Sequence, residues 1–335
     1  MMYVKTGLRT TTGLQALLRR ALGFALAALL GLAPARALSE EIIYITAKAD
    51  LPFWDTVAKG VKSVAASNGY EFLELDSNLN ADLQLAHVRR AIERKAAGIV
   101  ISPTNSNSAK AALALANKAN LPVAIADIGT QGGDYVSFVK SDNYRGSYDV
   151  GAELASALKA QGWTKASYAM VTIELTRKNG QERTAGFRDA MQDAGFAAEV
   201  ALRQMKDYSA EETYRHVREI LLAHPQLNGL FIETDQPVDG AMRAIREAGK
   251  EKQVLLVSFD AMPGIVHLLK GGDLVAVGMQ QPFLMGDSAA QALVSRLHGR
   301  TPAKEILVPI LVATDRNIDH LMPIASKTVF GEAAR

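Results

Sequence analysis

The chain has 335 residues, of which 48% are hydrophobic and 21% charged, and it contains no cysteine. The lack of cysteine excludes disulfides, thiolate metal sites, a cysteine nucleophile and a lipid-anchored N-terminal cysteine. The formal charge of +2 arises at the N-terminus, because residues 1–37 hold five basic residues and no acid. The remainder has 32 basic and 35 acidic residues. Such a mildly acidic body gives no reason to expect nucleic-acid binding.

The N-terminal segment is predicted to be a signal peptide. Arg19 and Arg20 precede an apolar run over 21–33, and small residues at Ala35 and Ala37 fit a signal-peptidase site. The run has about 13 residues and is too short to span a bilayer comfortably. A membrane anchor or an amphipathic helix is the alternative, and the general secretory route is favoured over the twin-arginine route. The expected mature protein is soluble and exported, and it starts near Leu38.

Short apolar runs alternate with segments of helical spacing along the rest of the chain. In the first half, strands are expected at 42–46, 70–75, 98–101, 121–127 and 135–139, with helices at 53–68, 81–96 and from 106 to near 120. The pattern then restarts with helices at 146–160, 181–194, 210–223, 236–248, 263–270 and 283–297 and strands at 167–172, 199–204, 227–233, 254–260, 275–280 and 306–313. The last 20 residues are expected to follow the surface without regular structure. Strands that alternate with helices predict α/β lobes with parallel sheets and right-handed crossovers.

One unit of this pattern occurs twice. A strand that begins at Gly98 is followed by a helix and by a strand that ends at Asp127. The same order runs from Gly229 to Asp260, over 31 positions compared with 29 in the first unit. Ligands of open α/β sheets bind beyond the carboxyl ends of the strands. The repeat therefore predicts two similar lobes, each offering one acid to a shared site.

Many short motifs occur in the order found in one known family. They are Pro52-Phe53-Trp54, Leu75-Asp76-Ser77, Ile101-Ser102-Pro103-Thr104, Ala119-Asn120, Ser141-Asp142-Asn143, Glu182-Arg183, Gly186-Phe187, Ala223-His224-Pro225, Gly240-Ala241, Phe259-Asp260 and Gln280. With these motifs, residues 40–315 resemble the ribose-binding-protein group, the periplasmic sugar-binding proteins of ABC importers with the type I fold.

This resemblance implies two Rossmann-like lobes joined by a three-segment hinge, near residues 141–143, 280 and 307–314. The N-terminal lobe would comprise residues 38–142 plus about 281–306. The C-terminal lobe would comprise 143–280 plus about 307–335. The ligand would lie between the lobes, which close on it.

A sugar offers C–H groups on its faces, which aromatic rings can cover. By family position, Phe53 and Trp54 would lie against the ligand from the first lobe, and Tyr208 from the second. Adjacent helix positions point apart, so one of the first two could instead belong to the core. Tyr208 could instead be a surface loop residue.

The hydroxyls at the edge of a sugar need carboxylates and other polar side chains, since charged partners make the stronger hydrogen bonds. Family position assigns Asp127 and Asp260 as edge acceptors and Arg183 as a hydroxyl-binding arginine. Gln280 lies on a crossing segment. Thr234 stands where the family usually has asparagine. The alternatives are helix N-caps for the aspartates and a surface salt bridge for Arg183.

Three departures from the ribose-binder pattern lie in the first lobe. Ile128, Leu51 and Ala47 stand where ribose binders have arginine, asparagine and serine. A buried ligand hydroxyl left without a partner costs about 1–3 kcal/mol. The expected ligand is therefore another sugar, a polyol, a deoxy sugar or a small molecule with an apolar edge. Lys48 or Asp50 could supply a replacement polar contact.

The favoured function is a periplasmic receptor for a sugar or similar small molecule, which delivers its ligand to a membrane permease of an ABC importer. It is expected to be a monomer and not an enzyme, without a cofactor or metal site, since the six histidines are dispersed and no phosphate-binding or nucleophile motif occurs. A periplasmic sensor that presents its closed form to a histidine kinase or chemoreceptor remains the alternative. A sugar-responsive transcription regulator is rejected because a signal sequence replaces the DNA-binding segment. A glycosidase that uses Asp127 and Asp260 is disfavoured by the resemblance.

Overall fold

The computed structural model describes residues 1–3, 40–261 and 264–332. The apolar run of the predicted signal peptide and its cleavage site near Ala37 lie outside the described residues. From Glu40 onward the chain forms one compact unit that contains two six-stranded sheets. None of the described helices is long and apolar enough to cross a membrane.

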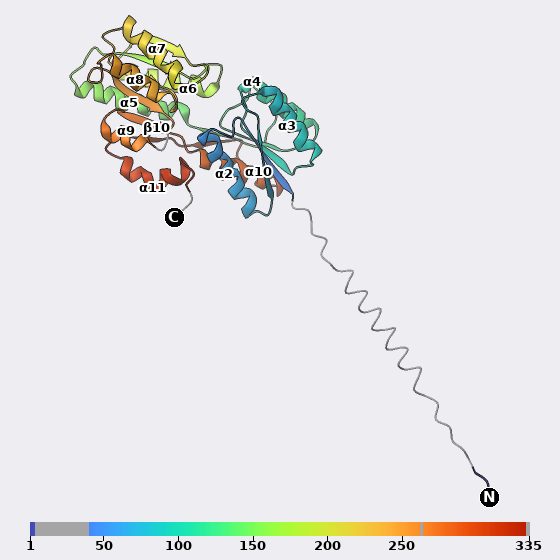
Figure 1. Cartoon of the computed structure of the whole chain (residues 1–335). Coiled ribbons are helices and arrows are strands. Elements are labelled where there is room, and N and C mark those ends of the chain that lie inside the picture. Colours follow the sequence, from blue (N-terminus) through green and yellow to red (C-terminus); the bar gives the residue numbers. More distant parts are fainter. Residues whose placement is uncertain (4–39, 262–263, 333–335) are drawn as a thin grey trace. The chain divides into compact units, whose positions relative to one another are not determined.

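The first sheet has the strand order β11-β5-β4-β3-β1-β2, and every adjacent pair is parallel. Its strands are β1 (Glu41–Thr46), β2 (Glu71–Asp76), β3 (Gly98–Ile101), β4 (Val123–Ala126), β5 (Phe138–Ser141) and β11 (Glu305–Val308). Its helices are α2 (Pro52–Ser67), α3 (Ala81–Glu93), α4 (Ser106–Lys118) and α10 (Pro282–Leu297). Helices α2 and α10 cover one face, and α3 and α4 the other (Figure 1). These elements form the first lobe.

The second sheet has the order β12-β10-β9-β8-β6-β7. Its strands are β6 (Ser167–Thr172), β7 (Ala198–Gln204), β8 (Gly229–Ile232), β9 (Leu255–Phe259), β10 (Ala276–Met279) and β12 (Leu311–Ala313), of which β12 is antiparallel to β10. Helices α5 (Asn143–Ala160) and α6 (Lys178–Asp193) pack on one face. The other face carries α7 (Ala210–Ala223), α8 (Val238–Glu247), α9 (Ile265–Gly271) and α11 (Ile318–Thr328). These elements form the second lobe.

The central strands are apolar runs because helices cover both faces of each sheet. Every residue of β3, β4, β8 and β10 is buried. The covering helices approach each other closely at glycines. In the α2–α10 pair, a Cβ atom on Gly60 would lie 2.2 Å from a backbone oxygen of the facing helix, and a Cβ atom on Gly286 would lie 2.0 Å from one. In the α5–α6 pair, a Cβ atom on Gly186 would lie 2.1 Å from the backbone oxygen of Tyr144. Both lobes thus have glycine where two equivalent helices meet, which lets the helices pack closely.

Three segments connect the lobes. The chain crosses at Asp142, at Gln280–Gln281 and at Pro309–Ile310, between elements that belong to different sheets. The crossings are hydrogen-bonded to one another. The backbone N–H of Asp142 donates to the carbonyl oxygen of Val308 (3.1 Å), and the side-chain amide of Gln281 donates to that of Pro309 (2.8 Å). The predicted α/β fold of two lobes with mostly parallel sheets is confirmed.

Two expectations for the C-terminal part were wrong. The apolar segment 306–313 is two strands in different sheets, β11 and β12. The break falls at Pro309, because proline has no N–H to donate to a sheet. The last 20 residues do not lack regular structure, since they include α11, whose Ile318 and Ala325 are fully buried in the second-lobe core. Pro323 inside this helix hid the helical pattern.

Candidate ligand-binding site

Both sheets end at one pocket of about 250 Å³, which we call the ligand pocket. Its residues follow the carboxyl ends of strands β1, β2, β4, β6, β7, β8, β9 and β10, the position expected for ligands of α/β sheets. The lining residues are Lys48, Leu51, Phe53, Trp54, Leu79, Asp127, Ile128, Ile173, Arg177, Asn179, Arg183, Asp207, Tyr208, Thr234, Asp235, Gln236, Asp260 and Gln280. All eight residues predicted as ligand-binding are among them.

Aromatic side chains stand on both sides of the pocket. Phe53 and Trp54 open α2, and their rings meet edge to face with centroids 4.8 Å apart. Trp54 is 7% exposed and packs in the first-lobe core, whereas Phe53 is only partly buried. Tyr208 comes from the second lobe, and the guanidinium of Arg177 lies 5.3 Å from its ring centroid. A ring-shaped ligand could therefore be held between apolar faces from both lobes.

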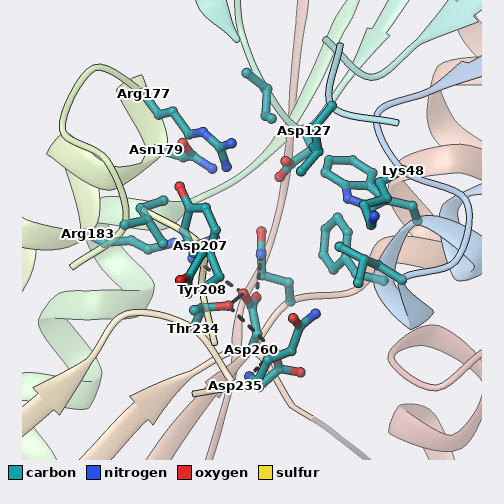
Figure 2. A pocket seen from close by; sticks show the side chains of 18 residues that line it. Lys48, Asp127, Arg177, Asn179, Arg183, Asp207, Tyr208, Thr234, Asp235 and Asp260 are labelled. Atoms are coloured by element: carbon teal, nitrogen blue, oxygen red, sulfur yellow. Dashed lines mark hydrogen bonds and ion pairs between the residues drawn. The ribbon is translucent and has the colours of Figure 1, made fainter. Parts of the chain in front are cut away.

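Asp260 lies at the centre of a hydrogen-bond network in the second lobe (Figure 2). Its carboxylate accepts from the Gln280 amide, from the Thr234 hydroxyl (3.2 Å) and from the Arg183 guanidinium (3.5 Å). Gln280 belongs to the second crossing segment, between β10 and α10. A carboxylate of the pocket is thus linked directly to the connection between the lobes.

Arg183 is a buried part of the second lobe and not a surface residue, since only 2% of it is exposed. Its Nε donates to Asn143 Oδ1 (2.8 Å) and one Nη to the carbonyl oxygen of Glu233 (2.8 Å). Its guanidinium lies 4.1 Å from the ring centroid of Phe259. These contacts fix the guanidinium at the pocket wall, so any ligand meets a pre-set donor.

Glu233 lies next to this pocket wall but does not belong to the pocket lining. Its carboxyl accepts from the Ile173 backbone N–H (3.1 Å) and from the Thr184 hydroxyl (2.6 Å), and it is fully buried. Burial raises the pKa of Glu233 to about 8, against the effects of Thr184 and Arg183. The residue ties the ends of β6 and β8 to α6, on which Arg183 is carried.

Asp127 has a very different setting in the first lobe. It is 5% exposed, and its Oδ1 has no hydrogen-bond partner among the described residues. Burial raises the pKa of Asp127 to about 6, although the charge of Arg183 acts to lower it. In Figure 2 its carboxylate points into the pocket, opposite the side chains of the second lobe. Neither aspartate is the N-cap of a helix among the described residues, which was the alternative role considered for both.

The first-lobe wall is poor in polar groups. Leu51, Leu79 and Ile128 line the pocket on this side, and Ile128 is 2% exposed within the core. Lys48 is the added polar residue, and its ammonium is held by Asn78 (3.2 Å) and Asp50 (3.5 Å). The second lobe supplies most of the hydrogen-bonding groups, so the pocket has one mainly apolar and one mainly polar wall.

Sequence reasoning did not identify several polar residues of the second lobe. These are Arg177 and Asn179 after β6, Asp207 after β7, and Asp235 and Gln236 after β8. Their position just beyond a strand end was the available signal. Burial and then the charge of Asp260 raise the pKa of Asp235.

Four buried polar atoms of the pocket lining have no hydrogen-bond partner within the described part of the chain. They are the acceptors Asp127 Oδ1 and Gln280 Oε1, the Tyr208 hydroxyl, and the donor Arg177 Nε, which lies 4.0 Å from the Glu174 carboxylate. Buried polar groups are nearly always paired in folded proteins. No group of three or more histidine, aspartate or glutamate side chains in the described residues could hold a metal ion. The free groups therefore fit a ligand that both donates and accepts hydrogen bonds.

Comparison with known proteins identifies the family to which this two-lobe fold belongs. Residues 42–301 match the periplasmic binding protein domain. The chain belongs to this family. The ribose import binding protein of Salmonella typhimurium is 30% identical to this periplasmic binding protein over 264 residues, which are 78% of this chain and 86% of the relative. The predicted membership of the ribose-binding-protein-like group is confirmed.

Solved structures agree with the fold. A carbohydrate transporter solute-binding protein from Agrobacterium radiobacter, in complex with D-arabinose, superposes with a TM-score of 0.79 at 22% identity, covering 88% of this chain and 99% of that one. An ABC transporter solute-binding protein from Bacillus halodurans with bound myo-inositol gives a TM-score of 0.76 at 20% identity, over 86% and 99% of the two chains. At these identities the likeness establishes the two-lobe fold.

Proposed function

We propose that this protein is the substrate-binding component of an ABC importer, and that it binds a sugar or a similar polyhydroxyl compound in the ligand pocket. The observation that carries the proposal is a pocket with aromatic rings on both sides and four buried polar atoms without a hydrogen-bond partner among the described residues. These atoms are Asp127 Oδ1, Gln280 Oε1, Arg177 Nε and the Tyr208 hydroxyl. Sugars present hydroxyls at the edge and C–H faces to rings. The relatives named for ribose import support the same ligand class.

Binding is proposed to close the two lobes around the ligand. The pocket takes residues from both lobes, and three short segments connect them. A ligand that contacts both walls stabilises the closed arrangement by its differential affinity for it. The closed protein would then present its ligand to a membrane permease. No bond of the ligand is broken in this function.

We further propose that the eight predicted residues contact the ligand and that the protein works in the periplasm after cleavage near Ala37. Edman sequencing of the protein from a periplasmic fraction tests the location, and a mature N-terminus near Leu38 is expected. Recovery of the uncleaved chain with membranes would contradict it.

A thermal-shift screen tests the binding function. The purified protein is heated with pentoses, hexoses, deoxy sugars and polyols, and titration calorimetry follows each positive result. At least one compound should raise the Tm in a saturable way. Chromatography of the recovered ligand should show it unchanged. Failure of every compound to bind, or turnover of the ligand, would overturn the proposed function.

A further inference from the structure

A second cavity of about 170 Å³ adjoins the ligand pocket. We call it the side cavity. It shares six lining residues with the pocket, namely Leu51, Phe53, Asp235, Gln236, Asp260 and Gln280. The other six are Pro52, Thr56, Ala261, Pro282, Val329 and Phe330. A ligand in the pocket would therefore lie directly beside this space.

The side cavity has a mainly apolar lining, since seven of the twelve described residues that form it are leucine, proline, phenylalanine, alanine or valine. The Thr56 hydroxyl already donates to the Pro52 carbonyl (2.9 Å). On the shared wall, Asp260 accepts from three side chains, and Asp235 Oδ1 accepts from the Gln236 backbone N–H (2.7 Å). Asp127 and Arg177 line the ligand pocket and not this cavity, whereas Gln280, whose Oε1 has no hydrogen-bond partner among the described residues, belongs to the shared wall.

The outer wall of the side cavity comes from the C-terminal end of the described chain. Val329 and Phe330 follow α11, which is anchored in the second-lobe core. The next residue, Gly331, reaches the first lobe, because a Cβ atom there would lie 3.0 Å from the Thr56 hydroxyl. The Lys327 ammonium also lies 5.2 Å from the ring centroid of Phe283 in α10. An apolar wall is thus held against both lobes.

We propose that the side cavity receives an apolar substituent of the bound ligand, so that the ligand is a polyhydroxyl compound carrying an alkyl or aryl group. The inference rests on the proposed function and specifies the ligand class for the same site. The hydroxyl-bearing part would occupy the ligand pocket, whose lining contains buried polar atoms without a hydrogen-bond partner among the described residues. The substituent would displace water from apolar surface, and each buried methylene should tighten binding about fourfold.

Titration calorimetry with matched glycosides tests this inference. The probes are free D-ribose, D-xylose, D-glucose and D-galactose, with the methyl, propyl and phenyl glycosides of each in both anomers. For at least one parent sugar, the propyl or phenyl glycoside should bind tenfold or more tightly than the free sugar. If free sugars bind and no glycoside binds more tightly, the side cavity is only clearance for lobe movement and the inference is overturned. If neither these probes nor the screened compounds bind, both the proposed function and this inference are overturned.

Two variants of Phe330 locate the effect. Phe330→Trp should fill the side cavity, and Phe330→Ala should remove an apolar wall. Each should reduce the preference for the glycoside at least fivefold while the affinity for the free sugar stays within twofold. Ile324→Ala is the matched control, because Ile324 lies on α11, is 51% exposed and does not line either cavity. An unchanged preference in both Phe330 variants contradicts the inference.

Discussion

Asp127 and Asp260 occupy equivalent backbone positions in the two lobes. Asp127 follows β4, and its N–H donates to the carbonyl oxygen of Val139 on β5 (2.8 Å). Asp260 follows β9, and its N–H donates to that of Gly278 on β10 (2.8 Å). Both residues have left-handed backbone angles, with φ of 69° and 63°. Aspartate is among the few residue types that tolerate this region.

Their side chains differ in the partners that the protein supplies. Asp260 accepts from Gln280, Thr234 and Arg183. Asp127 Oδ1 has no such partner in the described residues, although it is buried. The second-lobe carboxylate is therefore part of the folded network before any ligand arrives. The first-lobe carboxylate bears a desolvation cost that a ligand can offset.

Replacement of Asp127 should separate binding from stability. We expect Asp127→Asn to weaken ligand binding about 10- to 100-fold, the effect of losing a hydrogen bond to a charged group. Its Tm without ligand should be equal to or above that of the parent protein, because a desolvated charge is removed and asparagine accepts a left-handed backbone. Thermal unfolding and calorimetry provide both values. Asp134→Asn, at an exposed position of the same lobe, should change neither. Unaltered binding by Asp127→Asn would refute the role of this carboxylate.

Ligand affinity should depend on pH through Asp127. Burial raises its pKa to about 6 from 3.8. The charges that act on this carboxyl are those of Arg183, Asp260 and Arg177. If only the ionised form accepts the ligand's hydroxyls, affinity for a neutral sugar should be about tenfold weaker at pH 5 than at pH 7.

The stability of the ligand-free protein should respond in the opposite direction. A carboxyl with a raised pKa in the folded state binds more protons there than in the unfolded state. Its contribution therefore becomes more favourable as pH falls from above 6 toward 4. Asp127→Asn should flatten the affinity profile and reduce this gain in stability. An affinity profile that stays steep in the variant would assign the titration to another group.

Arg183 should be important for stability as well as for binding. Removing one partner of a buried charge pair costs about 3–5 kcal/mol, so urea denaturation should show a loss of this order for Arg183→Met. Arg183→Lys should recover only part of it, since an ammonium cannot reproduce the contacts with both Asn143 and Phe259. Arg188→Met is the control on the same helix. Its partner is Glu199 and its side chain is 43% exposed, so its cost should stay below about 1 kcal/mol. Equal losses at positions 183 and 188 would contradict this account.

An ion pair between the lobes should favour the closed form. Lys140 of β5 lies 3.3 Å from Glu182 of α6, with side chains 12% and 23% exposed. Glu182→Gln should weaken ligand binding by a few fold, as expected from about 0.2–1 kcal/mol for such a pair. A double-mutant cycle with Lys140→Met should show coupling that decreases at high salt. The pair Arg145–Asp149 lies within α5, and breaking it should leave affinity unchanged. Strictly additive effects at positions 140 and 182 would rule out the pair's role in closure.

The site was predictable from the sequence because its residues follow strand ends. Asp127 and Asp260 each close a short apolar run, and the topology of parallel sheets sends such positions to one edge. The resemblance to sugar-binding proteins then selected Arg183, Tyr208, Thr234 and Gln280 among many polar residues. All lie in the ligand pocket; their contact with a ligand stays a prediction.

Features that depend on distant contacts were not predictable. Nothing in the sequence around Arg183 shows that it contacts Asn143, 40 positions earlier, and the ring of Phe259. The side cavity likewise needs Phe330 to meet residues near Leu51. Local periodicity carries no information on contacts between residues that are far apart in the sequence, because these contacts arise from the packing of complete lobes.

The order in which the chain supplies the elements of its two lobes has a consequence for how the protein folds. The first lobe receives α10 and β11 from residues 282–308, after all strands of the second sheet except β12. Met285 and Leu293 of α10 are fully buried in the first-lobe core. A nascent chain emerging N-terminus first cannot fill that core until nearly its whole length is available. The half that is synthesised first is completed last, and a fragment ending at residue 142 would lack both α10 and β11 of its lobe.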